Sequence, residues 1–155
     1  MKPRTALIIN DMQRQFKAAN DETTISNVIR EVRKAKKLKQ FIILVEYGRQ
    51  YTISKIRETL KGYKYLFKVT KDDDDGSYEI IKCILKNQLG VTQFNVCGVN
   101  TSYCVHDTVE GLCQFIGKIP IRVIKDACNC EDVGSDIASI RSLKRKNKGR
   151  NRITV

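Results

Sequence analysis

The sequence predicts an α/β fold, a three-layer αβα sandwich built on a mostly parallel sheet of about six strands. Short apolar runs rich in β-branched residues alternate along the chain with segments of helical periodicity. The segments between successive runs are long enough for crossover helices, which connect parallel strands and cover both faces of a sheet. No internal repeat or linker interrupts the 155 residues, so we expect a single domain, 1–155.

The first strand is expected at residues 5–10, an apolar run that ends at Asp11. Such a continuous run is typical of a strand buried on both faces of a parallel sheet. The later strands are expected at residues 41–45, 65–69, 94–97, 119–124 (ending at Asp126) and, at the end of the chain, 151–155.

Helices are expected between these strands, where apolar residues recur at helical spacing. They cover residues 26–38, 53–60, 78–89, a segment that starts at Cys104, and 133–143. Four aspartates and a glycine at residues 72–76, here called the acidic loop, precede the third of these helices. We interpret the acidic loop as solvated; alternatively, its charges act on Lys71 or reject anionic substrates.

Cys104 lies where a strand, a turn at Gly98 and the first turn of a helix follow one another. Unpaired N–H groups and the positive end of the helix dipole stabilise a thiolate at such a place. We therefore expect a nucleophilic cysteine with a low pKa. The alternative is a buried cysteine that only fills space.

Three predicted strands end close to a group capable of chemistry, namely Asp11, Lys71 and Cys104. Ligands of open α/β sheets bind beyond the carboxyl ends of the strands, so these side chains can converge there. In such a triad Cys104 attacks, Asp11 transfers the proton, and Lys71 stabilises both negative charges. His106, the only histidine, is two residues from Cys104 on a helix, so we expect it to point away.

Composition limits the other classes of function. No apolar run approaches the roughly 18 residues that span a membrane, and the N-terminus lacks a signal-peptide pattern. We therefore expect a cytoplasmic protein without a membrane segment, with its six cysteines reduced.

The net charge of +12 is concentrated at residues 30–39 and 141–152. These runs indicate solvated helix faces; nucleic-acid binding is the alternative, although no aromatic residue interleaves with them.

Residues 6–16, 69–71 and 98–105 match, in order and spacing, the motifs of the isochorismatase-like cysteine hydrolases. The chain resembles this superfamily, which includes the nicotinamidases, over nearly its whole length. The resemblance implies a six-stranded parallel sheet and an Asp11–Lys71–Cys104 triad. It also implies a cis peptide bond between Val99 and Asn100, with the N–H groups of Asn100 and Cys104 directed at an oxyanion.

The resemblance further implies hydrolysis of a C–N amide bond through a thioester, without a cofactor. We expect a small amide, ureido or carbamoyl compound as substrate. Gln13, Phe16 and Tyr103 are expected to line its pocket. Family members form dimers or tetramers, so we expect a homo-oligomer.

Two departures from the family matter. Nicotinamidases bind zinc with an Asp and two His after the second strand, whereas this chain has no histidine at residues 46–49, so we expect no metal. The acidic loop also replaces a shorter, less acidic segment. Two other functions stay open: a catalytically idle protein of this fold that binds nucleic acid or acidic partners, and a redox sensor based on Cys104.

Overall fold

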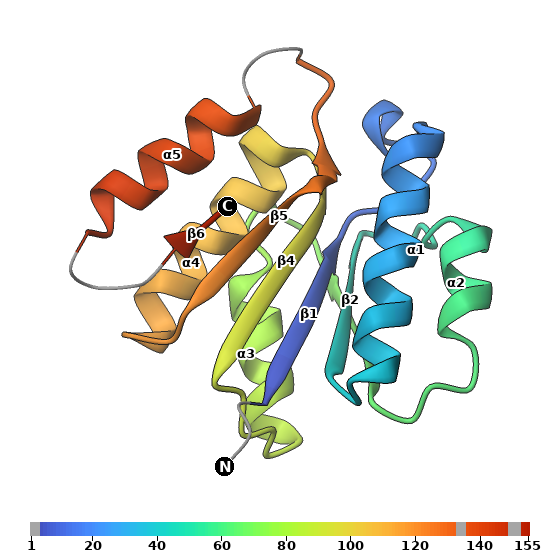
Figure 1. Ribbon diagram of the computed structural model, residues 1–155, viewed down its shortest axis with the longest axis horizontal. Helices are drawn as coiled ribbons and strands as arrows, with labels where there is room; N and C mark the ends of the chain where they lie inside the picture. The colour runs from blue at the N-terminus through green and yellow to red at the C-terminus, as the bar shows by residue number, and fades with distance from the viewer. Residues whose placement is uncertain (1–3, 133–135, 149–152) are drawn as a thin grey trace.

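The computed structural model describes residues 4–132, 136–148 and 153–155. A six-stranded parallel sheet forms its centre, with helices on both faces (Figure 1). The strands are β1 (Thr5–Asn10), β2 (Phe41–Tyr47), β3 (Leu66–Lys71), β4 (Gln93–Val99), β5 (Ile121–Asn129) and β6 (Ile153–Thr154). The predicted αβα sandwich is therefore confirmed.

The helices follow the strands in alternation. They are α1 (Glu22–Lys37), α2 (Ser54–Leu60), α3 (Ser77–Lys86), α4 (His106–Ile116) and α5 (Asp136–Lys146). A short 3-10 helix, η1 (Lys17–Asn20), precedes α1, and a π-helical turn, η2 (Thr101–Val105), precedes α4. Of the described helices, none is long and apolar enough to cross a membrane.

The order of the strands in the sheet is β3-β2-β1-β4-β5-β6. The chain moves outward from β1 to β3, returns to the other side of β1 to form β4, and continues outward to β6. The winding therefore reverses between β1 and β4. In open α/β sheets, ligands bind at the carboxyl ends of the strands at such a reversal.

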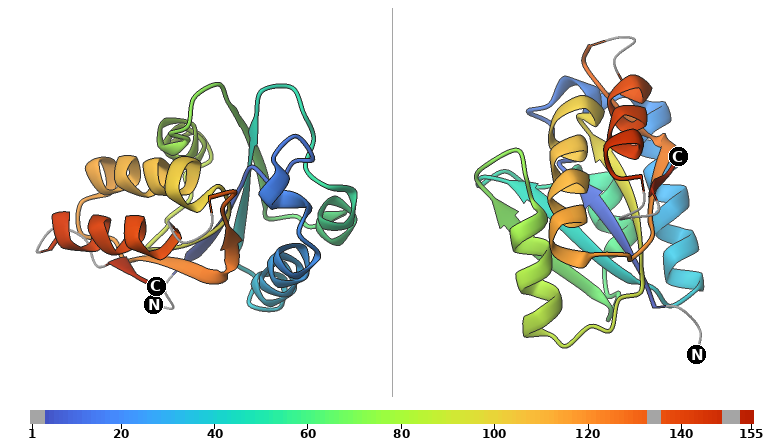
Figure 2. Two further views of the ribbon diagram at one scale, coloured as in Figure 1. Left: turned by 90° about the horizontal axis from the view of Figure 1, so that it is seen from above. Right: turned by 90° about the vertical axis from the view of Figure 1, so that its left-hand side faces the viewer.

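Two apolar cores hold the three layers together. One core packs α1 and α2 against one face of the sheet, with Val28, Val32 and Ile56 fully buried. The other packs α3, α4 and α5 against the opposite face, with Ile80 and Leu112 fully buried. Figure 2 shows this division of the helices from above the sheet.

Gly98 permits β1 and β4 to approach one another closely. Its φ is +119°, a conformation that residues with a Cβ rarely adopt, and a Cβ there would collide with the main chain of Asn10. The register between β4 and β5 also shifts between Val96 and Gly98. The extra residues lie in β5, between Val123 and Cys128, which pair with Val96 and Gly98.

Several expected boundaries differ from the structure. β5 runs from Ile121 to Asn129, so Asp126 lies within the strand and does not end it. Lys71 is the last residue of β3 and does not follow it. Parts of the helix expected at 133–143 and of the strand expected at 151–155 lie outside the described residues.

Candidate active site

Asp11 and Lys71 meet at the carboxyl ends of β1 and β3. Lys71 Nζ lies 2.9 Å from Asp11 Oδ2, and the two side chains are 1% and 0% exposed. Lys71 pairs with Tyr47 of the intervening strand β2, so its side chain passes over β2 to reach Asp11. The Asp11 N–H donates to Val45 O (3.0 Å), and the residue has a left-handed φ of 51°. Aspartate tolerates this conformation better than most residues.

The Asp11 carboxylate is buried but available as a proton acceptor. Burial raises the pKa of Asp11, and the neighbouring Lys71 ammonium and Cys104 thiol offset this only in part. Lys71 and Cys104 are the neighbours of this carboxylate, and among the described residues no further group donates a hydrogen bond to its oxygens. A buried carboxylate with a raised pKa is suited to general base catalysis near neutral pH.

Cys104 lies in η2, not in the first turn of an α-helix, and is 3% exposed. Burial and the Asp11 carboxylate raise the pKa of its thiol to about 12, although Lys71 lowers it. This is opposite to the low pKa that the strand-turn-helix pattern predicts. The physical reason is that desolvation and a neighbouring carboxylate both disfavour a second negative charge. The resting site therefore holds a neutral thiol beside the Asp11 carboxyl group.

The segment from Val99 to Val105 has an unusual backbone. The peptide bond between Val99 and Asn100 is cis. The N–H groups of Tyr103 and Val105 both donate to Asn100 O, at 3.2 and 3.1 Å. Asn100 Oδ1 accepts the N–H of Glu131 (3.2 Å). Asn100 is thus fixed on both its main chain and its side chain.

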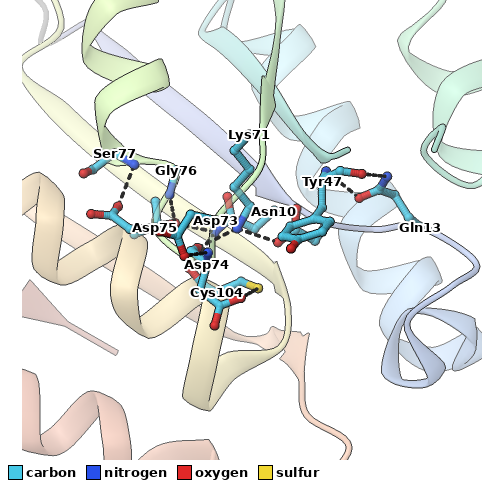
Figure 3. A network of polar contacts seen from close by, with 12 residues as sticks. Asn10, Gln13, Tyr47, Lys71, Asp73, Asp74, Asp75, Gly76, Ser77 and Cys104 are labelled. Atoms are coloured by element: carbon cyan, nitrogen blue, oxygen red, sulfur yellow. Dashed lines mark hydrogen bonds and ion pairs between the residues drawn. The ribbon is translucent and has the colours of Figure 1, made fainter. Parts of the chain in front are cut away.

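The acidic loop lies against Lys71 and Cys104. The interpretation of this loop as solvated did not predict these contacts. Lys71 Nζ donates to Asp74 O (2.5 Å), and the Cys104 thiol lies 3.4 Å from Asp74 Oδ1. Figure 3 shows the acidic loop and Cys104 on one side of Lys71, with Tyr47 and Gln13 on the other. Asp74 was not predicted as a site residue, because its distance from Cys104 depends on the loop conformation.

Asn10 and Thr108 form a buried hydrogen-bonded connection that sequence reasoning missed. Asn10 Nδ2 donates to Cys104 O and to Thr108 Oγ1, both at 3.2 Å. Thr108 Oγ1 also accepts the N–H of Gly76 (3.0 Å). The end of β1, the Cys104 segment and the acidic loop are therefore joined. A polar residue ending an apolar strand was the only signal in the sequence.

Gln13 and Phe16, expected to line the pocket, both act on Tyr47. The Gln13 amide donates to Tyr47 O (3.0 Å) and Gln50 O (2.7 Å) and accepts the Tyr47 N–H (2.8 Å). The Phe16 ring meets the Tyr47 ring edge-on, with 6.0 Å between centroids. The Tyr47 ring lies 5.8 Å from Lys71 Nζ, so this unpredicted tyrosine connects the expected pocket residues to the triad.

Tyr103 and His106 lie near Cys104 in sequence but have other contacts. Tyr103 is 48% exposed, and its hydroxyl donates to Asp132 Oδ2 (2.8 Å), which raises the pKa of Tyr103. His106 Nδ1 lies 2.8 Å from Asp107 Oδ1. The structure thus brings Asp11, Lys71 and Cys104 together and directs Tyr103 toward Asp132.

The carboxylate of Glu46, near the end of β2, is already bound by other groups of the protein. Glu46 Oε1 accepts the N–H and the hydroxyl of Thr52, at 2.8 and 2.9 Å, and Glu46 Oε2 lies 2.6 Å from Lys68 Nζ. Elsewhere in the described chain, His106, Asp107 and Glu110 gather potential metal-ligand atoms on one face of α4. These residues lie outside the triad, and Glu110 also faces Lys146 at 3.6 Å.

Comparison with solved structures shows that the chain has the fold of the isochorismatase-like superfamily. A nicotinamidase from Staphylococcus aureus matches with a TM-score of 0.80 and 15% identity over 99% of each chain. An isochorismatase from Pseudomonas putida matches with a TM-score of 0.72 and 15% identity over 97% of this chain and 87% of its own.

A third similar structure has a different activity in its name. It is the MAR1 ribonuclease from Caenorhabditis elegans, with a TM-score of 0.80 and 19% identity over 99% of this chain and 79% of its own. No protein-family model and no curated protein sequence matches the chain. At these identities the comparisons show the fold and not the activity.

Proposed function

We propose that this protein is a hydrolase that cleaves a C–N bond of a small amide, ureido or carbamoyl compound through a thioester on Cys104. The observation that carries the proposal is the Asp11–Lys71 ion pair, 2.9 Å long and almost without exposure, next to the Cys104 thiol. The similarity in fold to nicotinamidases and an isochorismatase supports the same class of reaction.

In the first half-reaction, Cys104 Sγ attacks the carbonyl carbon while its proton passes to Asp11. The N–H groups of Asn100 and Cys104 stabilise the resulting oxyanion. When the tetrahedral intermediate collapses, the C–N bond breaks and Asp11 returns the proton to the leaving nitrogen. This leaves an acyl group on sulfur and releases an amine or ammonia.

In the second half-reaction, water attacks the thioester. Asp11 accepts a proton from this water, the C–S bond breaks, and the thiol is restored with that proton. Lys71 compensates the charge of Asp11 throughout, because its ammonium faces the Asp11 carboxylate, and it stabilises negative charge on sulfur. Phe16 and Tyr47 provide an aromatic wall, and Gln13 positions Tyr47. We also propose that Gln13 and Tyr103 line the pocket and contact the substrate directly.

The test is a screen of small amides, ureides and carbamoyl compounds for release of ammonia or amine. Intact-mass measurement after rapid acid quenching should detect an acyl adduct on Cys104. Cys104→Ala should abolish turnover and adduct, and Asp11→Asn should lower the rate of adduct formation at least about 100-fold. Cys113→Ala, which removes another buried thiol, is the matched control and should retain both. Turnover that survives Cys104→Ala would refute the mechanism.

Nucleic-acid binding is a second candidate, favoured by one surface feature. Two adjoining hollows lie along β5, and each has a volume of about 390 Å³. Arg30 of α1, Arg141 of α5, and Arg122 and Lys125 of β5 line them. One arginine from each of α1 and α5 thus lies at these adjoining hollows, and one protein of similar structure is named a ribonuclease.

Salt dependence separates this candidate from the first. If these hollows bind single-stranded RNA, the logarithm of the association constant should fall linearly with the logarithm of salt concentration. Replacing Arg30 and Arg141 with alanine should reduce that slope, and fluorescence anisotropy measures both. Replacing the exposed Lys61 and Lys118 with alanine is the charge-matched control. An unchanged slope in the Arg30 and Arg141 variant would exclude binding at these hollows.

We also propose that residues 1–155 form one domain of a cytoplasmic homo-oligomer, a dimer or tetramer. The six strands belong to one sheet, which supports a single domain. The resemblance to oligomeric family members supports the assembly.

A further inference from the structure

A second carboxylate lies against the proposed nucleophile. Asp74 Oδ1 is 3.4 Å from Cys104 Sγ, within hydrogen-bond distance for a thiol. The Asp74 main-chain carbonyl accepts a 2.5 Å hydrogen bond from Lys71 Nζ. One residue of the acidic loop thus touches two members of the triad, through different atoms.

The rest of the acidic loop fixes Asp74 in this place. Asp75 Oδ1 accepts the Ser77 N–H at the start of α3 (2.7 Å), and the Gly76 N–H donates to Thr108 of α4. A side chain at Gly111 of α4 would collide with the Asp75 carboxylate and with Ser77 Oγ. The loop is therefore packed against α3 and α4, and the position of Asp74 is part of the fold.

The charges at the site do not balance once Asp74 is counted. Lys71 compensates Asp11 directly, at 2.9 Å. Within the described residues, no lysine, arginine or histidine forms an ion pair with the Asp74 carboxylate. Lys71 is also the ion-pair partner of the fully buried Asp11 among the described residues, so it cannot compensate Asp74 as well. A group that enters beside Cys104 Sγ therefore meets two carboxylates and a single ammonium.

We propose that Asp74 determines specificity by charge: the substrate carries a cationic group, such as an ammonium or guanidinium, near the scissile carbonyl, and carboxylate-bearing compounds are rejected. This inference rests on the proposed function of Cys104. It assigns to the site a preference opposite in sign to what the net charge of +12 implies for the whole surface. The surface field attracts anions over a long range, whereas Asp74 acts at contact distance.

Alkylation of Cys104 by reagents of different charge tests this directly. The reagents are anionic iodoacetate, neutral iodoacetamide and cationic 2-bromoethylamine, at pH 7.5 with peptide mapping. Each rate is divided by the rate with a small neutral thiol. In the wild type, the normalised iodoacetate rate should be at least about tenfold below that of iodoacetamide, as expected for like charges at close range. Bromoethylamine should show the opposite bias.

Three variants identify the source of the bias. Asp74→Asn should bring the three normalised rates within about twofold of one another, and Asp74→Glu should retain the discrimination. Asp72→Asn removes the same charge from an exposed position of the same loop and should behave like wild type. Because rates are compared within one protein, a general change in thiol reactivity cancels.

The outcomes separate this inference from the proposed function. If Cys104 reacts and Asp11→Asn slows it, but Asp74→Asn leaves the charge bias unchanged, specificity by Asp74 is refuted and the triad stands. If the bias depends on Asp74 but Asp11→Asn changes nothing, the proposed base is refuted and the charge selection stands. If no reagent modifies Cys104 in the native protein, both are refuted.

Discussion

Asp11 and Lys71 are two charged side chains that the protein places almost entirely out of contact with water. Each is tolerable there because of the other, since an isolated buried charge is far more costly than a compensated one. Asp11 also has a left-handed backbone, φ 51°. Such conformations cluster at functional sites, where the surrounding structure enforces them.

Replacing Lys71 with methionine should therefore destabilise the protein strongly. The variant leaves the Asp11 carboxylate buried without its counter-ion, and we expect the free energy of unfolding to fall by about 3–5 kcal/mol. Urea denaturation followed by circular dichroism measures this loss. Lys55→Met, which breaks an exposed ion pair with Glu22, is the control and should cost less than about 1 kcal/mol. Equal losses would contradict the description of the buried pair.

The reactivity of Cys104 should have a distinctive pH profile. Its pKa is raised to about 12 and that of Asp11 is raised, so between these values the pair holds a single proton. Alkylation through that state should be nearly independent of pH above the raised pKa of Asp11, and should slow at lower pH as Asp11 is protonated.

Iodoacetamide labelling with mass spectrometry, at pH values from 5 to 10, would follow this profile. Asp11→Asn should lose the flat region, so that its rate rises about tenfold per pH unit, as for an ordinary thiol below its pKa. A wild-type rate that rises in the same way would show that Asp11 does not act on Cys104.

At the scale of residues, the sequence indicated which side chains belong to the site but not which other residues they contact. Polar or reactive groups beside apolar runs pointed to Asp11, Lys71 and Cys104, because parallel strands end at one edge of a sheet. Asp74 and Tyr47 were not anticipated. Their positions depend on loop packing between elements distant in sequence, and no local pattern encodes that packing.

At the scale of elements, the contact between β1 and β4 is the most constrained. Gly98→Ala should lower the free energy of unfolding by at least about 2 kcal/mol, because its Cβ meets the Asn10 main chain and its φ is +119°. Gly48→Ala is a matched control: φ is +60° but no atom lies within 4 Å of the added Cβ. It should cost about 1 kcal/mol. Thermal melts of both variants make the comparison; similar losses would show that backbone conformation alone matters.

Element type was predictable from periodicity, whereas boundaries were set by tertiary contacts. Asp126 marked a strand end in the sequence, yet β5 continues to Asn129 because its partner β4 continues beside it to Val99. Similarly, the pattern after Gly98 indicated a helix but not the π-helical turn that carries Cys104. Asn10, which is more than 90 residues earlier in the sequence, donates hydrogen bonds to Cys104 O in this turn and to Thr108 in α4.

At the scale of the whole molecule, we expect self-association. Several large apolar side chains are more than half exposed, including Leu38, Tyr51, Tyr78, Leu85 and Phe115. Light scattering coupled to size-exclusion chromatography should give a mass two or four times 17.8 kDa. If only the 17.8 kDa monomer is detected at micromolar concentration and above, the proposed oligomer is contradicted.

The fold class followed from the alternation of strands and helices, but the order of the strands did not. Strands and helices alternate along the sequence in the same way whether successive strands are added to one side of the sheet or to both sides of β1. The reversal requires β1 to be central, and a wholly apolar run shows burial on both faces without identifying the neighbours.

The position of β1 has a consequence for synthesis on the ribosome. Thr5 of β1 pairs with Gln93 of β4, so β1 has one edge that stays open until β4, more than 80 residues later, has emerged. During that interval β1, β2 and β3 present an apolar edge able to pair with other nascent chains. Cells that make this protein quickly should therefore depend on chaperones that hold the N-terminal half until β4 is translated.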